Sequence, residues 1–130
     1  MKYLVDSDFL ISFSSDEDST HPKSIEIYKN LDENTELLAL NLVFQESTTV
    51  VSKRFGMQKA KTFYEMINKF IDTRILLDDG IEKEAWKIFL KQNKKGTSFI
   101  DCANLAALEK YKLDGILSFD EYYPKNVRIN

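Results

Sequence analysis

Four acidic side chains, far apart along the chain, offer most of the chemistry in this sequence: Asp6, Glu46, Asp101 and Asp120. Asp6 directly follows a short apolar run, and Asp120 directly follows another. In open α/β sheets, ligands bind beyond the carboxyl ends of the strands, where the strand order reverses. Carboxylates that meet at such a place repel each other unless they are protonated or bridged by a cation. Hard oxygen ligands of this kind suit Mg²⁺ or Mn²⁺.

The apolar pattern predicts the elements that position these acids. Helical periodicity, clearest from Ala60 to Ile71, separates short apolar runs, which is typical of parallel strands joined by right-handed crossovers. If the first three strands extend the sheet in one direction and the fourth pairs on the free side of the first, Asp6 and Asp120 become neighbours. The expected strands are Lys2–Asp6, Glu36–Leu40, Arg74–Leu77, Gly115–Phe119 and Val127–Ile129.

Residues that start or stop helices refine this prediction. Asn41 is a candidate N-cap for the helix that carries Glu46 in its first turns. Ser98 begins the helix before the fourth strand and forms a capping arrangement with Asp101, three residues later. Gly56 is expected to break a helix, and Asp78-Asp79-Gly80 is expected to form a turn after the third strand.

Length and composition limit the class of protein. The chain has 130 residues, 43% of them hydrophobic, and a net charge of −3, which suits a single domain spanning residues 1–130. No stretch reaches the ~18 apolar residues of a membrane span, and the N-terminus turns acidic too early for a signal peptide. We therefore expect a cytoplasmic protein. Cys102 is the only cysteine, which excludes an internal disulfide and a cysteine-rich zinc site.

The same residues resemble the signature of the PIN-domain ribonucleases. The resemblance covers nearly the whole chain and rests on Val5–Leu10, Glu46, Ser98–Asp101 and Ile116–Tyr123. It implies a three-layer α/β/α domain with a central, mostly parallel sheet of four to five strands. Family members with a single domain of this length are most often VapC-type toxins. The resemblance therefore implies an endoribonuclease that uses Mg²⁺ or Mn²⁺. It also implies a cognate antitoxin, which neutralises the enzyme, and a homodimer.

The resemblance also implies roles for individual residues. Asp6, Glu46, Asp101 and Asp120 would be the catalytic, metal-binding acids, with Ser118 and Ser98 as supporting polar residues. Asp8 departs from the family pattern, which more often has a neutral residue there, so this carboxylate either joins the metal shell or faces solvent. The implied reaction is metal-assisted phosphodiester hydrolysis.

Two further groups of residues have two interpretations each. Lys91, Lys94 and Lys95 precede Ser98 and either contact RNA phosphates or form a solvated helix end. The aromatic residues Phe63, Tyr64 and Phe70 are expected in the core, and any exposed part of them would be a dimer or antitoxin surface.

Other functions explain part of the same pattern. Asp6-Ser7-Asp8 after an apolar strand also resembles the opening of haloacid-dehalogenase-like phosphotransferases, in which Asp6 would be the nucleophile. That interpretation requires a later lysine at the site and gives Glu46 and Asp101 no role. A third possibility is a non-catalytic metal-binding module. Taken singly, each acid also suits a helix cap, a turn or a solvated surface.

Overall fold

The computed structural model describes residues 1–130 and contains a five-stranded sheet. The strand order is β3-β2-β1-β4-β5, and every neighbouring pair is parallel. The order of the first four strands is the one predicted from the sequence, with β4 on the free side of β1. The strands are β1 (Lys2–Val5), β2 (Glu36–Leu40), β3 (Thr73–Ile75), β4 (Gly115–Leu117) and β5 (Arg128–Ile129).

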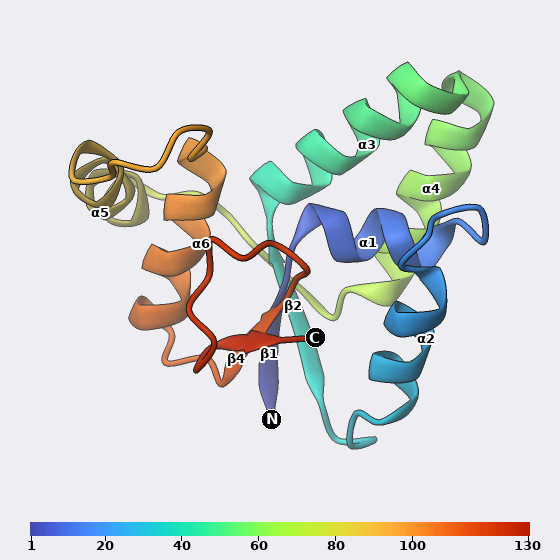
Figure 1. Ribbon diagram of the computed structural model, residues 1–130, viewed down its shortest axis with the longest axis horizontal. Helices are drawn as coiled ribbons and strands as arrows, with labels where there is room; N and C mark the ends of the chain where they lie inside the picture. Colours follow the sequence, from blue (N-terminus) through green and yellow to red (C-terminus); the bar gives the residue numbers. More distant parts are fainter.

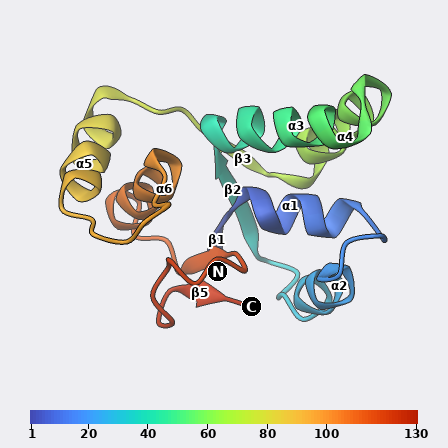
Figure 2. The ribbon, with the colours of Figure 1, turned by 45° about the horizontal axis from the view of Figure 1, so that its top comes forward.

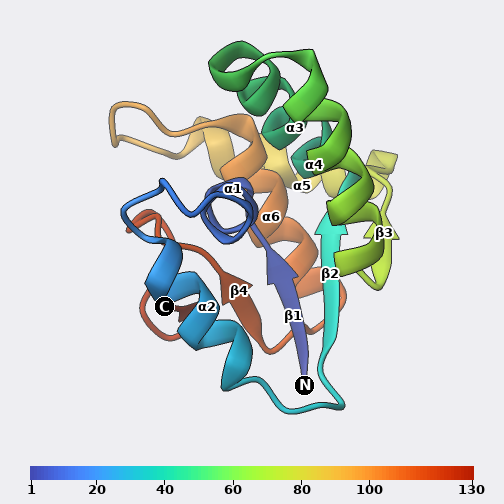
Figure 3. The ribbon, with the colours of Figure 1, turned by 90° about the vertical axis from the view of Figure 1, so that its right-hand side faces the viewer.

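Six helices cover the two faces of the sheet, which confirms the predicted three-layer α/β/α architecture. The crossover from β3 to β4 runs opposite to the two before it, so α5 and α6 lie on one face and α1 to α4 on the other (Figures 1, 2 and 3). None of the helices combines the length and the apolar character that a bilayer crossing requires. The helices are α1 (Ser7–Ser14), α2 (His21–Lys29), α3 (Asn41–Phe55), α4 (Met57–Phe70), α5 (Asp79–Leu90) and α6 (Phe99–Lys110).

The core explains why the central strands are short runs of aliphatic residues. Leu4, Val5, Ile116 and Leu117 are fully buried because helices cover both faces of β1 and β4. Burial of such a side chain contributes roughly 1.5–3 kcal/mol. The two strands are in register, with Val5 opposite Leu117. The core therefore fixes where β1 and β4 end relative to each other.

Two boundaries differ from the sequence-based prediction because a side chain has a hydrogen-bond partner other than the expected one. Asn41 is not an N-cap: it is the first residue of α3, whose N-cap is Leu40, and its Oδ1 accepts the backbone N–H of Leu77 at 2.9 Å. Asp79 and Gly80 do not form a free turn but begin α5, whose N-cap is Asp78. The Asp78 carboxylate accepts the N–H of Ile81 at 2.8 Å, which is an ordinary helix cap.

Other segments are shorter than predicted. β1 ends at Val5, since Asp6 is already the N-cap of α1. β4 ends at Leu117, two residues before the predicted end at Phe119. The predicted break at Gly56 is confirmed: its φ of 90° is a conformation that suits glycine, and it separates α3 from α4.

Gly115, at the start of β4, packs directly against the chain before β5. A Cβ atom there would lie 2.7 Å from the carbonyl oxygen of Val127, which accepts the N–H of Ile116. We expect Gly115→Ala to lower the free energy of unfolding by about 1–3 kcal/mol, the usual cost of overpacking, as measured by urea denaturation. Gly80→Ala is the control, because its Cβ would meet only an ordinary contact at 3.4 Å. Equal stability of the two variants would contradict this close approach.

Candidate metal centre

The ends of β1 and β4 bring Asp6 and Asp120 to the same edge of the sheet. Asp6 directly follows β1, and its backbone N–H donates to the carbonyl of Leu117 at 3.1 Å. This bond extends the β1–β4 pairing by one step, so the two chains separate only beyond it. Asp120 lies three residues after Leu117 on the neighbouring chain. The gap between β1 and β4 is the point where the strand order reverses, which is the usual ligand site of such sheets.

Asp101 reaches this edge from the first turn of α6. The side chain of Ser98 accepts the N–H of Asp101 at 3.0 Å, and Asp101 Oδ2 accepts the N–H of Ser98 at 3.2 Å. This is the capping box that the spacing predicts. Carboxylate oxygens of Asp6, Asp101 and Asp120 all lie within 4.8 Å of one another. Three of the four predicted acids thus meet in space, although they are spread over most of the chain.

Glu46 lies beside this group rather than in it. It is the sixth residue of α3, and its carboxylate accepts a short hydrogen bond from the Oγ of Ser7, the first residue of α1. Its oxygens are not among those within 4.8 Å of one another. Because Ser7 directly follows Asp6, Glu46 is tied to the same edge through one intervening side chain.

Ser118 and Asp8 connect the two strand ends. Ser118 is buried; its Oγ donates to Asp6 Oδ2 at 3.0 Å and accepts the N–H of Asp120 at 3.0 Å. Asp8 accepts the N–H of Phe119 at 3.0 Å and lies 3.3 Å from the same serine oxygen. Asp8 is therefore held against the chain that follows β4, not turned into solvent.

Two residues at this site were given no role by the sequence analysis. Asn104 and Tyr123 are completely buried, and their side chains contact Asp6 and Asp101 respectively. The signal for Asn104 is its spacing: it lies three residues after Asp101, on the same face of α6, as an amide within a run of apolar residues. Tyr123 ends the segment Ile116–Tyr123 that carries the family resemblance, but nothing in its residue type shows that its hydroxyl faces an acid.

Comparison with known proteins agrees with this geometry. The sequence model of the PIN domain matches residues 3–128. The chain belongs to the PIN domain family. No curated protein matches it.

Three solved structures show how far the PIN fold extends over this chain. VapC20 of Mycobacterium tuberculosis, described as a toxin that cleaves the sarcin-ricin loop, is 18% identical with a TM-score of 0.81 over 91% of this chain and 89% of that one. VapBC2 of Rickettsia felis, bound to a promoter DNA fragment, is 11% identical with a TM-score of 0.72 over 100% and 98%. A toxin-antitoxin complex of Klebsiella pneumoniae is 11% identical with a TM-score of 0.64 over 98% and 96%. At these identities the likeness establishes the fold.

No lysine or arginine forms an ion pair with the clustered acids of this PIN domain; the guanidinium of Arg128 lies beside them but donates to the backbone carbonyl of Asp120, at 3.2 Å. The three ion pairs of the molecule join Lys2 to Glu36, Lys23 to Glu26 and Lys110 to Asp78, all away from the cluster. No lysine approaches Asp6, so the lysine that a phosphotransferase site of the haloacid-dehalogenase type requires is missing from this position. The family match and the missing lysine both favour the nuclease interpretation.

Burial makes the negative charge of these acids costly. The pKa of Asp6 is raised to about 8, chiefly because the carboxyl group is removed from water and secondly because Asp8 is close. Hydrogen bonds from the Ser7 N–H and from Ser118 oppose this shift. Burial likewise raises the pKa of Asp8 to about 6. A bound cation would relieve both effects, because it favours the ionised form of each carboxylate.

The donor set fits Mg²⁺ or Mn²⁺. Three carboxylates from separate segments offer oxygen atoms only, and Mg²⁺ is usually held by one or two carboxylates together with waters. The single cysteine of the PIN domain, Cys102, is buried, and its Sγ lies 3.4 Å from the hydroxyl of Tyr122. Sulfur thus takes no part in this site, which suits a hard cation.

The remaining sequence candidates lie around this centre. Lys91, Lys94 and Lys95 are exposed in the segment that joins α5 to Ser98. Their role as RNA contacts stays a prediction. Among the aromatic residues of α4, Phe63 is buried as expected, whereas Tyr64 is 39% exposed. The assignment of this exposed face to a dimer or an antitoxin also stays a prediction.

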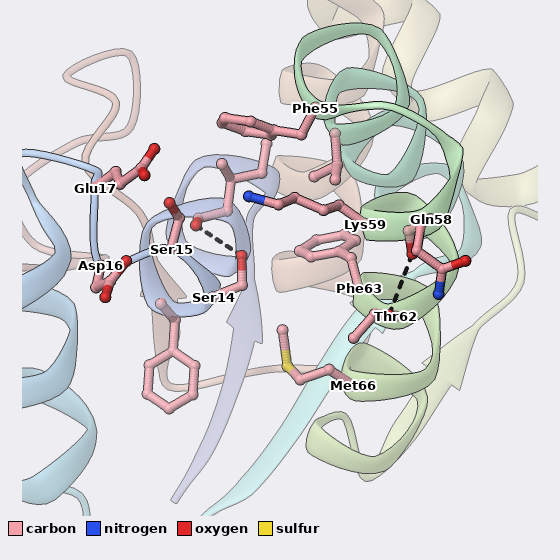
Figure 4. Close-up of a pocket in the computed structure, with 13 residues that line it drawn as sticks. Ser14, Ser15, Asp16, Glu17, Phe55, Gln58, Lys59, Thr62, Phe63 and Met66 are labelled. Carbon is pink, nitrogen blue, oxygen red and sulfur yellow. Dashed lines mark hydrogen bonds between the residues drawn. The ribbon is translucent and has the colours of Figure 1, made fainter.

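A cavity of about 490 Å³ lies apart from the acids. It is lined by the end of α1, the loop after it and the facing sides of α3 and α4, and none of the clustered acids belongs to it. Figure 4 shows Lys59 reaching from α4 toward the end of α1, with Phe63 beside it. Because α1 begins at the acid cluster and ends at this cavity, the two features occupy opposite ends of one helix.

Proposed function

We propose that this PIN domain is a divalent-metal-dependent endoribonuclease and the toxin of a toxin-antitoxin pair. The observation that carries the proposal is the meeting of Asp6, Asp101 and Asp120 without a basic partner. Membership of the PIN family supports the same reaction class. Among structural neighbours, one is described as an RNA-cleaving toxin and another as a toxin-antitoxin complex, which supports the substrate class and the partner.

The proposed roles follow from the contacts of each acid. Asp6, Asp101 and Asp120 would hold Mg²⁺ or Mn²⁺, and Glu46, fixed by Ser7, would complete the acidic quartet at the edge of the site. When bound, the cation supplies positive charge for the phosphate and activates water for attack. Ser118 keeps Asp6 and the backbone of Asp120 together and so maintains the distance between the two strand ends.

The reaction is a hydrolysis in which one bond forms and one breaks. The oxygen of a water molecule bonds to the phosphorus atom, the bond from phosphorus to the ribose oxygen on the other side breaks, and a proton passes to the leaving oxygen. The acids would hold the cation, but they cannot bind RNA by themselves, because the carboxylates and the RNA phosphates are both negatively charged. Lys91, Lys94 and Lys95 are therefore proposed to contact the phosphates that flank the cleaved bond. We further propose a homodimer as the form that binds the antitoxin.

The decisive experiment measures cleavage of single-stranded RNA by the purified protein with Mg²⁺, with Mn²⁺ and with EDTA. We expect cleavage with either metal, loss of cleavage in EDTA and recovery when metal is restored, because the acid cluster needs a cation to act. A phosphomonoester is assayed in parallel. Cleavage that continues in EDTA would contradict the proposed mechanism. Turnover of the phosphomonoester would favour a phosphotransferase, and Mn²⁺ binding without cleavage of any RNA would favour a non-catalytic module.

A further inference from the structure

A buried chain of hydrogen bonds joins two of the clustered acids from inside the fold. The Nδ2 of Asn104 lies 3.3 Å from Asp6 Oδ1 and 3.0 Å from the hydroxyl oxygen of Tyr123. The Tyr123 hydroxyl in turn lies 3.2 Å from Asp101 Oδ1. An amide nitrogen has two protons and a hydroxyl has one, whereas an ionised carboxylate only accepts. All three protons are therefore used, and the chain ends on a carboxylate at each side.

Asn104 is not explained by the stability of the fold. Its side chain is completely buried in α6, among residues that are mostly small or apolar, and its Oδ1 has no hydrogen-bond partner. A buried acceptor without a partner lowers the stability of the fold, because nothing replaces the hydrogen bonds that it makes to water in the unfolded chain. An apolar residue of the same size would avoid this cost. The benefit of an amide at this position is thus its two N–H groups, which point toward Asp6 and Tyr123.

Packing in the core explains the ring of Tyr123 but not its hydroxyl. Tyr123 is the largest of the fully buried side chains, and a phenylalanine would supply the same ring. A phenolic hydroxyl is protonated at neutral pH. The Tyr123 hydroxyl therefore has a proton to donate to Asp101 Oδ1, 3.2 Å away.

We propose that Asn104 and Tyr123 are positioning residues, which hold the carboxylates of Asp6 and Asp101 in the arrangement that binds the divalent cation. This inference rests on the metal-dependent nuclease proposed above. It gives a role to the two buried side chains that contact the proposed metal ligands from the interior of the fold. Two carboxylates this close repel each other and separate unless neutral donors fix them. One rigid amide and one rigid phenol fix an oxygen of each acid from the same side. Groups that orient metal ligands in this way typically change metal affinity or activity 10–100-fold when removed.

Tyr123→Phe tests this role, and Tyr122→Phe is its matched control. Both changes remove one phenolic oxygen from adjacent residues, but the Tyr122 hydroxyl contacts the Sγ of Cys102 and no acid. The readouts are the Kd for Mn²⁺ of the full chain, kcat and KM for a single-stranded RNA, and Tm in EDTA. We expect Tyr123→Phe to weaken Mn²⁺ binding about 10-fold and to lower kcat about 10–100-fold with KM for RNA unchanged. Tyr122→Phe should keep the wild-type Kd.

Asn104→Leu provides a second variant, because it removes both donors and keeps a branched side chain with the same number of non-hydrogen atoms. We expect a similar loss of Mn²⁺ affinity together with a Tm in EDTA that does not fall, since the unpaired acceptor disappears. A lower Tm with unchanged Mn²⁺ affinity would show a structural role and overturn the inference. Wild-type Kd for Tyr123→Phe, or equal losses in Tyr123→Phe and Tyr122→Phe, would overturn it as well. Absence of Mn²⁺ binding by the wild-type protein would instead overturn the proposed function, and this inference with it.

Discussion

Asp6→Asn is expected to abolish RNA cleavage while raising the stability of the metal-free protein. Asp6 sits at the centre of the site, since its oxygens accept from the Ser7 N–H, Asn104 and Ser118 and lie near two other acids. Replacing one oxygen by a neutral NH₂ removes a ligand for the cation. A loss of several kcal/mol of metal-based stabilisation corresponds to at least about a 10³-fold fall in kcat.

The stability of this variant should rise at neutral pH because the buried Asp6 carboxyl group must take up a proton on folding, which an amide does not need. The new amide can donate to Ser118 Oγ, and the serine hydroxyl can then turn to Asp8, 3.3 Å away. The hydrogen-bonding groups therefore keep partners, while repulsion between Asp6 and Asp8 disappears. Single-turnover cleavage of RNA and urea denaturation in EDTA measure the two effects.

Asp79→Asn is the control for this change. Asp79 is an exposed acid in the first turn of α5, and its replacement should leave cleavage unchanged. Cleavage by Asp6→Asn at the wild-type rate would exclude Asp6 as a metal ligand. Failure of the variant to fold would mean that the carboxylate serves the structure itself.

The arrangement of the sheet follows from the sequence because it depends on local signals. Apolar runs such as Gly115–Phe119, helical periodicity between them and the rule of right-handed crossovers leave few ways to order the strands. Once that order is set, Asp6 and Asp120 must be neighbours. The Ser98–Asp101 capping box is equally local, since it needs only a spacing of three residues at the start of a helix. The convergence of these three acids was predictable for this reason.

Contacts between distant segments could not be predicted in the same way. Asn41 has the residue type of an N-cap, but its side chain accepts the backbone N–H of Leu77, which lies just beyond the neighbouring strand β3. The distance between Glu46 and the other acids depends on the tilt of α3, which the pattern of apolar residues does not encode. Tyr123 has the residue type of a core aromatic, and only the fold shows that its hydroxyl faces Asp101. Residue type alone does not distinguish these alternatives, because each depends on three-dimensional packing.

The metal-free protein is expected to lose stability as the pH rises from about 4 to 8. Burial raises the pKa of Asp6 from 3.8 to about 8 and that of Asp8 to about 6. In this window the unfolded chain releases these protons, whereas the folded protein retains them, so the unfolded state binds fewer protons and stability falls as pH rises. Each pKa unit corresponds to ~1.4 kcal/mol, so the two shifts together correspond to on the order of 5–10 kcal/mol, and Asp6 contributes the larger part. The lowered pKa values of Asp18 and Asp78 act only below about pH 4 and do not oppose the trend.

Mn²⁺ should reverse this dependence, because a cation binds the ionised carboxylates and displaces their protons. The increase in Tm that saturating Mn²⁺ produces is therefore expected to grow from pH 5 to pH 8, as measured by thermal unfolding with Mn²⁺ and with EDTA at each pH. Asp6→Asn separates the contributions of Asp6 and Asp8 to this pH dependence. In this variant only Asp8 titrates, so the decline of metal-free stability should end near pH 6. Its increase in Tm with Mn²⁺ should be small. A metal-free stability that stays constant or rises between pH 5 and 8 would show that Asp6 is ionised in the folded protein without a cation. The cluster would then need no metal to balance its charge.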